Sequence, residues 1–143
     1  MIGNISLSAL AAAAAECADR DSVTKLFAGF LESCGVRYAF AYRFDSGLKA
    51  AADRWTPLYV SFPAEIIDYY RSVRFAETDS LARAAFSSYL PVRFAEIAAG
   101  FDQSEARRGL HALFDKYGVK DILAMHVADR PGRGGYIALA YDR

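Results

Sequence analysis

The chain has 143 residues, of which 54% are hydrophobic and 14% aromatic, and its 17 basic residues balance 17 acidic ones. This length and apolar content predict one compact domain over residues 1–143 with a substantial core. A balanced charge gives no overall field toward phosphate backbones or anionic lipid. We therefore expect no direct nucleic-acid contact by this chain and no membrane contact.

The two cysteines and the apolar N-terminal segment indicate a reducing compartment. Cys17 and Cys34 lie in apolar stretches that resemble helices, which predicts buried free thiols rather than a disulfide. The apolar run at residues 10–15 is broken by Glu16 and has no preceding Lys or Arg, so it fits the face of a first helix better than a secretory signal. We expect a cytoplasmic protein.

Apolar periodicity and capping signals divide the chain into helices and strands. Asp21 or Ser22 is expected to cap the second helix, Gly35 to end it, and Pro63 to open the third. Helices are predicted near residues 6–18, 21–34, 63–74, 79–86 and 103–117. Strands are predicted near residues 36–44, 51–61, 121–128 and 135–142.

Strand pairs at both ends of a helical middle section determine the predicted fold class. They favour an α/β fold, an α/β/α sandwich with a central, mainly antiparallel sheet flanked by helices. Pro57 within the second strand favours a sheet edge or a bulge. The turn-rich residues 129–134 are expected to form a long hairpin loop between the last two strands.

An ordered set of short motifs resembles the autoinducer-binding domain of LuxR-type transcription regulators. Phe62 and Pro63 match the family's aromatic–proline pair, and Asp79 follows at the family's spacing. Later family motifs are matched at residues 91–94, 118–119 and 134–139. The resemblance implies a homodimer that holds an acyl-homoserine lactone between the sheet and a helical layer. It leaves open whether this single domain, which has no DNA-binding part, stands alone or belongs to a longer regulator with a helix-turn-helix domain.

The resemblance implies a set of ligand-binding residues with several departures from the family. Asp79 matches the aspartate whose carboxylate accepts the ligand's amide N–H, although it could equally cap the following helix. Phe62 stands where the family usually has a tyrosine, and Ile66 where it has a tryptophan, so two donors toward the ligand are missing. Tyr70 retains a ring that stacks on a head group or packs, and Phe94 keeps the apolar role of a second family tryptophan.

Four further residues complete the predicted site. Ala138 falls where the family often has a small hydroxyl residue, and Phe40 and Tyr42 belong to a face of rings that lines the site or packs as core. Trp55, together with Tyr59, is a candidate to replace the missing donors. The thinned polar contacts predict a different or less polar small amphiphile, or a pocket filled by side chains.

Chemistry other than ligand binding finds no support in the residue pattern. His111 and His126 lie in no cluster with metal-ligand spacing, so both are predicted to be structural, and no metal or cofactor is expected. The chain has no activated nucleophile, which argues against an enzyme. Arg107 and Arg108 are interpreted as a solvated helix face. The favoured function is sensing of an acyl-homoserine lactone-like ligand, and the alternatives are a ligandless dimerisation module or a PAS- or GAF-like sensor of another metabolite.

Overall fold

Two compact units make up the chain, Met1–Arg37 and Tyr38–Arg143. The computed structural model describes residues 6–45, 55–72, 80–88, 90–97, 105–130 and 133–142. The first unit contains α1 (Leu7–Ala15) and α2 (Arg20–Ser33). The second contains β1 (Tyr38–Phe44), β2 (Thr56–Val60), α3 (Ala64–Ser72), α4 (Ser80–Phe86), β3 (Val92–Arg93), α5 (Phe94–Ile97), α6 (Glu105–Tyr117), β4 (Asp121–Arg130) and β5 (Arg133–Tyr141). One domain over residues 1–143 stays a prediction.

The cap of α2 differs from the prediction. Asp19 is the N-cap, because its backbone is extended (φ −149°, ψ 169°) and its Oδ1 accepts the N–H of Ser22 at 2.7 Å. Asp21 and Ser22, the predicted caps, instead lie inside the first turn. The hydrogen bond from Ser22 also lowers the pKa of Asp19. At the other end of α2, Gly35 has a φ of 76°, as expected for the residue that ends a helix.

Both cysteines are free, but the prediction that they are buried is wrong. Cys17 is half-buried and Cys34 is exposed. Cys17 follows the end of α1, and Cys34 is the C-cap of α2. Both therefore lie at helix ends, where the chain leaves the helix and its apolar stripe.

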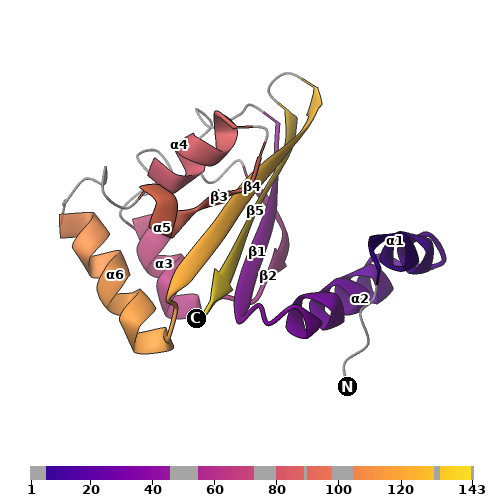
Figure 1. The fold of residues 1–143 in the computed structure, drawn as a ribbon, viewed down its shortest axis with the longest axis horizontal. Helices are drawn as coiled ribbons and strands as arrows, with labels where there is room; N and C mark the ends of the chain where they lie inside the picture. The colour runs from indigo at the N-terminus through magenta and orange to yellow at the C-terminus, as the bar shows by residue number, and fades with distance from the viewer. Residues whose placement is uncertain are drawn as a thin grey trace. The chain divides into compact units, whose positions relative to one another are not determined.

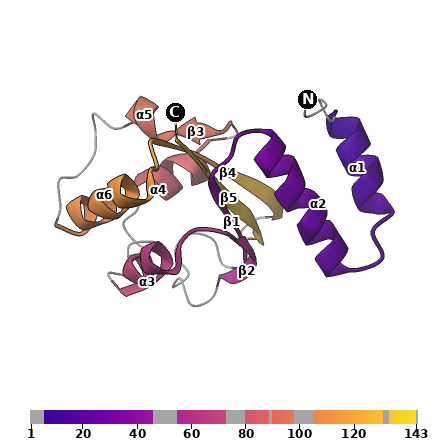
Figure 2. The ribbon, with the colours of Figure 1, turned by 90° about the horizontal axis from the view of Figure 1, so that it is seen from below.

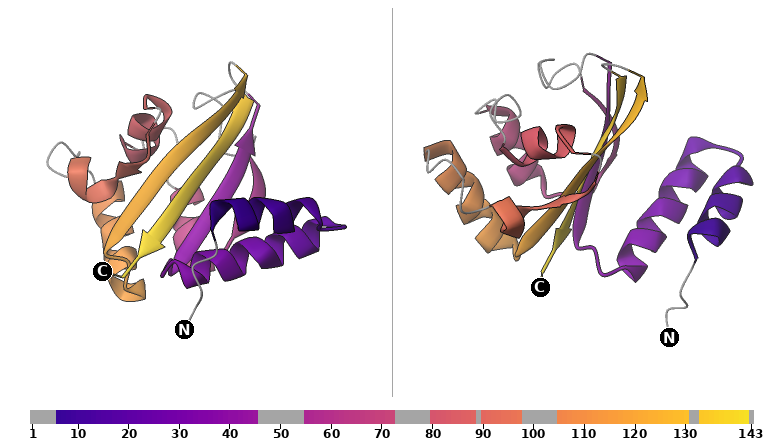
Figure 3. Two further views of the ribbon diagram at one scale, coloured as in Figure 1. Left: turned by 45° about the vertical axis from the view of Figure 1, so that its right-hand side comes forward. Right: turned by 45° about the horizontal axis from the view of Figure 1, so that its top comes forward.

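A five-stranded antiparallel sheet with strand order β2-β1-β5-β4-β3 forms the base of the second unit. Helices α3 to α6 lie together on one face of this sheet (Figures 1 and 2). The views in Figure 3 show the same arrangement from two other directions. The predicted fold class, α/β with a mainly antiparallel sheet flanked by helices, is confirmed.

Large residues of β1 lie beside small residues of β5 and β4 on the helix-covered face. Phe40 pairs with Ala138, and Ala138 pairs with Ala124. The two alanines are 2% and 0% exposed, respectively. Since an alanine rises little above the sheet, this row leaves a low floor next to the ring of Phe40. Tyr136, in the neighbouring row, is 1% exposed and forms one wall beside that floor.

The hairpins of the sheet confirm one prediction and correct another. The register between β1 and β2 shifts at Ala41 and Tyr42, opposite Pro57, and β2 is an edge strand, as the proline indicated. The long loop predicted over residues 129–134 is wrong. Arg130 pairs with Arg133, so strand pairing continues well into the turn-rich segment.

Two short elements were not predicted, and one buried carboxylate connects them to the sheet. β3 pairs with β4, and α5 follows at once. Asp121 is 8% exposed, and its Oδ2 accepts Nε and Nη2 of Arg93 at 2.9 and 2.6 Å. Its Oδ1 accepts the backbone N–H groups of Ala95 and Ile122 at 3.2 and 2.9 Å. Asp121 thus joins β3 and the start of α5 to β4.

Candidate functional site

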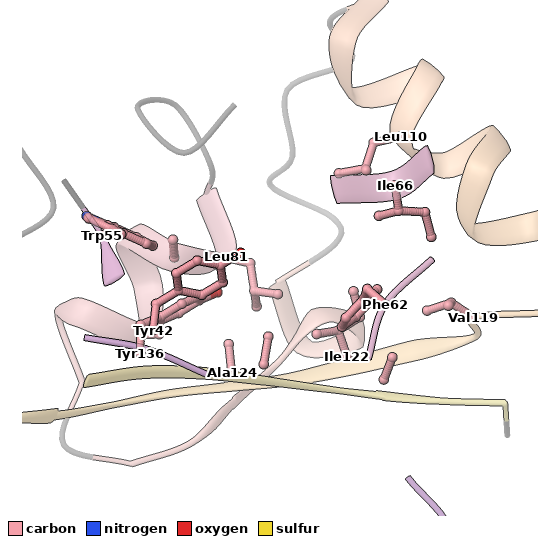
Figure 4. Packing of buried hydrophobic residues seen from close by; sticks show 14 of the residues in the cluster. Tyr42, Trp55, Phe62, Ile66, Leu81, Leu110, Val119, Ile122, Ala124 and Tyr136 are labelled. Carbon is pink, nitrogen blue, oxygen red and sulfur yellow. The ribbon is translucent and has the colours of Figure 1, made fainter. Parts of the chain in front are cut away.

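A cavity of about 60 Å³ lies between the sheet and the helices of the second unit. The described residues that line it are Phe40, Tyr42, Trp55, Phe62, Ile66, Ile67, Tyr70, Arg71, Leu81, Phe94, Arg107, Leu110, Phe114, Ile122, Tyr136 and Ala138. Figure 4 shows labelled members of this set, including Trp55, Leu81 and Phe62, between the strands and the helices that cover them. The wall is therefore built mainly from aromatic and aliphatic side chains.

Eight of the nine residues predicted for the site lie around this one cavity. They come from β1, from the segments before β2 and α3, and from α3, α5 and β5. These residues are Phe40, Tyr42, Trp55, Phe62, Ile66, Tyr70, Phe94 and Ala138. Asp79, the ninth, lies outside the described residues. That these side chains contact a ligand stays a prediction.

The face of rings on β1 serves the core and the cavity together. The rings of Phe40 and Phe62 lie 5.4 Å apart, and those of Phe40 and Tyr42 lie 5.3 Å apart in an edge-to-face arrangement. Phe44, further along the strand, packs on Phe86 at 4.8 Å and does not line the cavity. Tyr42 thus lines the cavity and belongs to the core, whereas Phe44 belongs to the core alone.

Trp55 brings an indole N–H to the buried region around the cavity. The residue is 7% exposed, and its ring lies 5.7 Å from that of Tyr136. Its Nε1 is buried and has no hydrogen-bond partner among the described residues. Leaving a buried donor without a partner costs about 1–3 kcal/mol of folding free energy. A ligand that placed an acceptor next to Nε1 would therefore gain binding free energy. Tyr59, its predicted companion, pairs with Ala41 and does not line the cavity.

Comparison with known proteins places this architecture in a family. Residues 19–143 match the family described as the autoinducer binding domain. The chain belongs to the autoinducer-binding family. The resemblance to an autoinducer-binding domain seen in the sequence motifs is confirmed, and so is the predicted class, a ligand-sensing domain. No curated protein matches the chain in sequence.

Two solved structures share the fold of this autoinducer-binding domain. One is CepR2 from Burkholderia cenocepacia, described as an N-acylhomoserine lactone dependent LuxR family transcription factor, with a TM-score of 0.69 and 16% identity. The other is SdiA from Escherichia coli, with a TM-score of 0.67 and 10% identity. Each alignment covers 95% of this chain, but it covers 76% of CepR2 and 54% of SdiA.

Arg107 is the charged residue of this autoinducer-binding domain that the sequence analysis misplaced. It is 5% exposed and lines the cavity, and its guanidinium carbon lies 5.7 Å from the ring centre of Phe94. The interpretation of a solvated face is wrong for Arg107 and holds for Arg108, which is exposed. Helical spacing explains the difference, because positions 107, 110 and 114 share one face of α6 with Leu110 and Phe114. That spacing was visible in the sequence.

His111 lies one turn beyond Arg107 and has an unusual environment. Its ring meets that of Phe94 edge-on at 5.2 Å and stacks on Phe114 at 6.3 Å. Its Nε2 is buried and has no partner among the described residues. Burial lowers the pKa of His111, the positive charge of Arg107 lowers it further, and Asp115 opposes both effects. The surroundings therefore favour the neutral imidazole.

His126 has the structural role predicted for it. Its Nδ1 donates to the carbonyl oxygen of Ala85 at 2.6 Å, and its ring stacks on Phe86 at 5.2 Å. This bond joins α4 to β4 at one end of the core.

None of the described helices combines the length and the apolar character needed to cross a bilayer.

Proposed function

We propose that this domain senses a small amphiphile of the acyl-homoserine lactone type in the cavity between the sheet and α3 to α6. The convergence of eight predicted site residues on that one cavity supports the proposal. Five of them are positions matched to the family, namely Phe62, Ile66, Tyr70, Phe94 and Ala138. Its apolar wall suits an acyl chain, because ligand pockets are lined mainly by hydrophobic and aromatic side chains with few polar groups. CepR2, which shares the fold, is described as dependent on N-acylhomoserine lactone.

The size of the cavity indicates how binding would become a signal. At about 60 Å³ it is much smaller than pockets for drug-sized ligands, which span roughly 300–1,000 Å³. It is also well below the cavity of about 150 Å³ that binds benzene in an engineered core. An amphiphile must therefore displace or repack lining rings. A ligand that prefers this repacked state shifts the population toward it, which is the physical basis of a sensor.

The chain offers a direct assay, because Trp55 is its only tryptophan and lines the cavity. The test is a titration of the whole chain with N-acyl-homoserine lactones of varied acyl length, followed by tryptophan fluorescence and by the melting temperature. Binding at 100 times the dissociation constant stabilises the folded state by about 2.7 kcal/mol. We expect a saturable fluorescence change and a higher melting temperature for some chain lengths.

Three variants locate the response. Ala138→Phe fills the floor of the cavity and is expected to abolish the ligand-induced rise, whereas Arg108→Met changes an exposed neighbour of the site and should leave it intact. Asp79→Ala tests the predicted acceptor of the ligand's amide N–H. If no member of the series changes either signal, the lactone-type proposal is wrong and the ligandless interaction module becomes the better account.

The homodimer implied by the family resemblance is a further part of the proposal. A self-associating sensor would couple ligand binding to assembly, since a ligand that stabilises one state also stabilises any contact made only in that state. Sedimentation equilibrium of the chain with and without a ligand that binds tests this. A monomer under both conditions would contradict it.

A further inference from the structure

Both charged side chains among the described lining residues of the cavity are positive. Arg107 reaches it from α6 and is 5% exposed, and Arg71 reaches it from the end of α3 and is exposed. The other described lining residues are uncharged. A cavity with low-dielectric walls focuses such charges, so these two side chains favour an anionic group.

The environment of Arg107 strengthens this preference. Its guanidinium lies against the ring of Phe94, which like Arg107 lines the cavity. The lowered pKa of His111, one turn along α6, arises first from burial and then from the positive charge of Arg107. The charge of Arg107 therefore acts on the half-buried ring of His111.

The start of α3 offers no side-chain donor toward a ligand, whereas α6 does. Phe62 and Ile66, at the start of α3, have no N–H or O–H to offer. A guanidinium carries five N–H donors in a planar fork, enough to serve protein groups and to bind a carboxylate through two parallel hydrogen bonds. The buried guanidinium on the described wall is thus on α6, whereas that of Arg71 on α3 belongs to an exposed residue.

We propose that the ligand of this cavity is an anionic amphiphile, a monocarboxylate with an apolar tail, and that Arg107 binds its carboxylate. The inference rests on the proposed function, namely that the cavity binds a small amphiphile. Two sources of this chemistry are a fatty acid and the ring-opened form of an acyl-homoserine lactone, in which hydrolysis of the lactone ester leaves a free carboxylate. Both present the same head group to Arg107.

The test compares pairs of probes that differ only in the head group. Dodecanoate is paired with dodecanamide, and N-dodecanoyl-homoserine with its lactone, each titrated at neutral pH against Trp55 fluorescence in the whole chain. Charge-assisted, two-pronged hydrogen bonds are worth about twice a neutral one, so we expect each acid to bind about ten- to a hundredfold more tightly than its neutral partner. A preference limited to the second pair identifies the ring-opened signal as the source.

Variants of two adjacent arginines assign the preference to one side chain. Arg107→Met keeps an apolar stem and removes the charge, and it should abolish the preference for the acid. Arg107→Lys keeps the charge without the planar fork and should retain part of it. Arg108→Met removes the same charge from the exposed side of α6 and should leave the preference unchanged. Melting curves without ligand show whether each variant folds.

The possible results separate this inference from the proposed function. Equal affinity of the wild-type chain for acid and neutral partner overturns the inference, even if Arg107→Met fails to fold. A preference for the acid that survives in a folded Arg107→Met variant overturns the role of Arg107. In both cases binding of the neutral probes leaves the proposed function intact. If no probe of either kind binds, both the proposed function and the inference are wrong.

Discussion

The contact between α3 and α6 makes a sharp prediction for Gly109→Ala. A Cβ added at Gly109 would meet Oη of Tyr69 and lie 2.7 Å from its Cζ, a separation that real Cβ atoms do not show. The same Oη donates to the carbonyl oxygen of Ala106 at 3.0 Å, so the ring cannot move without losing that bond. The substitution therefore requires the Tyr69 ring to move, with loss of that bond, or the two helices that flank the cavity to separate.

Opposing terms decide the size of the effect. Replacing glycine by alanine inside a helix gains about 1 kcal/mol. Overpacking costs about 1–3 kcal/mol, and loss of the Tyr69–Ala106 hydrogen bond costs about 1 kcal/mol. Gly109→Ala should therefore lower the free energy of unfolding by about 1–3 kcal/mol. With roughly 2–4 °C per kcal/mol for a chain near this size, the melting temperature falls by several degrees.

Urea unfolding followed by far-UV circular dichroism measures this against a matched control. Gly29 lies within α2, and nothing comes within 4 Å of a Cβ added there, so Gly29→Ala should raise stability by about 1 kcal/mol. In a Tyr69→Leu background, Gly109→Ala should lose most of its cost. If Gly109→Ala stabilises the chain as Gly29→Ala does, the close approach of Tyr69 to α6 is wrong.

Further predictions concern the carboxylate under β3, the cavity floor and the buried histidine. Asp121→Ala should lower the free energy of unfolding in urea by about 2–4 kcal/mol, because it removes a charge-assisted pair and leaves the N–H of Ile122 without its acceptor; a loss below about 0.5 kcal/mol would refute this. Ala138→Phe should lower stability by about 1–3 kcal/mol through overpacking, and a saturable lactone response in that variant would place the ligand elsewhere. Folding lowers the pKa of His111 below its ordinary value of 6.5. The imidazole therefore binds a proton more readily in the unfolded chain, and the free energy of unfolding falls as the pH falls through about 6.5. His111→Phe should reduce this slope between about pH 8 and 5, and an unchanged slope would contradict the assignment.

Elements with a regular local signal were predictable from the sequence. The ring alternation predicted β1, and Pro63 marked the start of α3, which begins at Ala64. β3 and α5 have two and four residues, too few to show a period, and a long-range contact of Asp121 holds them. Turn chemistry at residues 129–134 located the last hairpin but did not show that Arg130 still pairs with Arg133.

The residues of the candidate site were predictable where their position in a strand or helix determines the direction of the side chain. Phe40 and Tyr42 alternate on one strand, and Ile66 and Tyr70 are one helical turn apart, so each pair faces the same side. Arg107 was missed because its charge was used to infer exposure before its position in the helix was considered. The charge of an arginine favours exposure to solvent, whereas its position in the helix determines the face from which the side chain projects.

Ligand binding at Arg107 would act on the same helix contact that Gly109 permits. Ala106, whose carbonyl accepts the hydrogen bond from Tyr69, directly precedes Arg107 in α6. The cavity is lined from both α3 and α6. Repacking around a ligand held by Arg107 would therefore change the packing contact between these two helices. Linkage is reciprocal. The free energy by which Gly109→Ala changes ligand binding therefore equals the free energy by which the ligand changes the cost of Gly109→Ala. If a ligand favours closer α3–α6 packing, Gly109→Ala weakens its binding; if it favours separation, Gly109→Ala strengthens binding although it destabilises the fold.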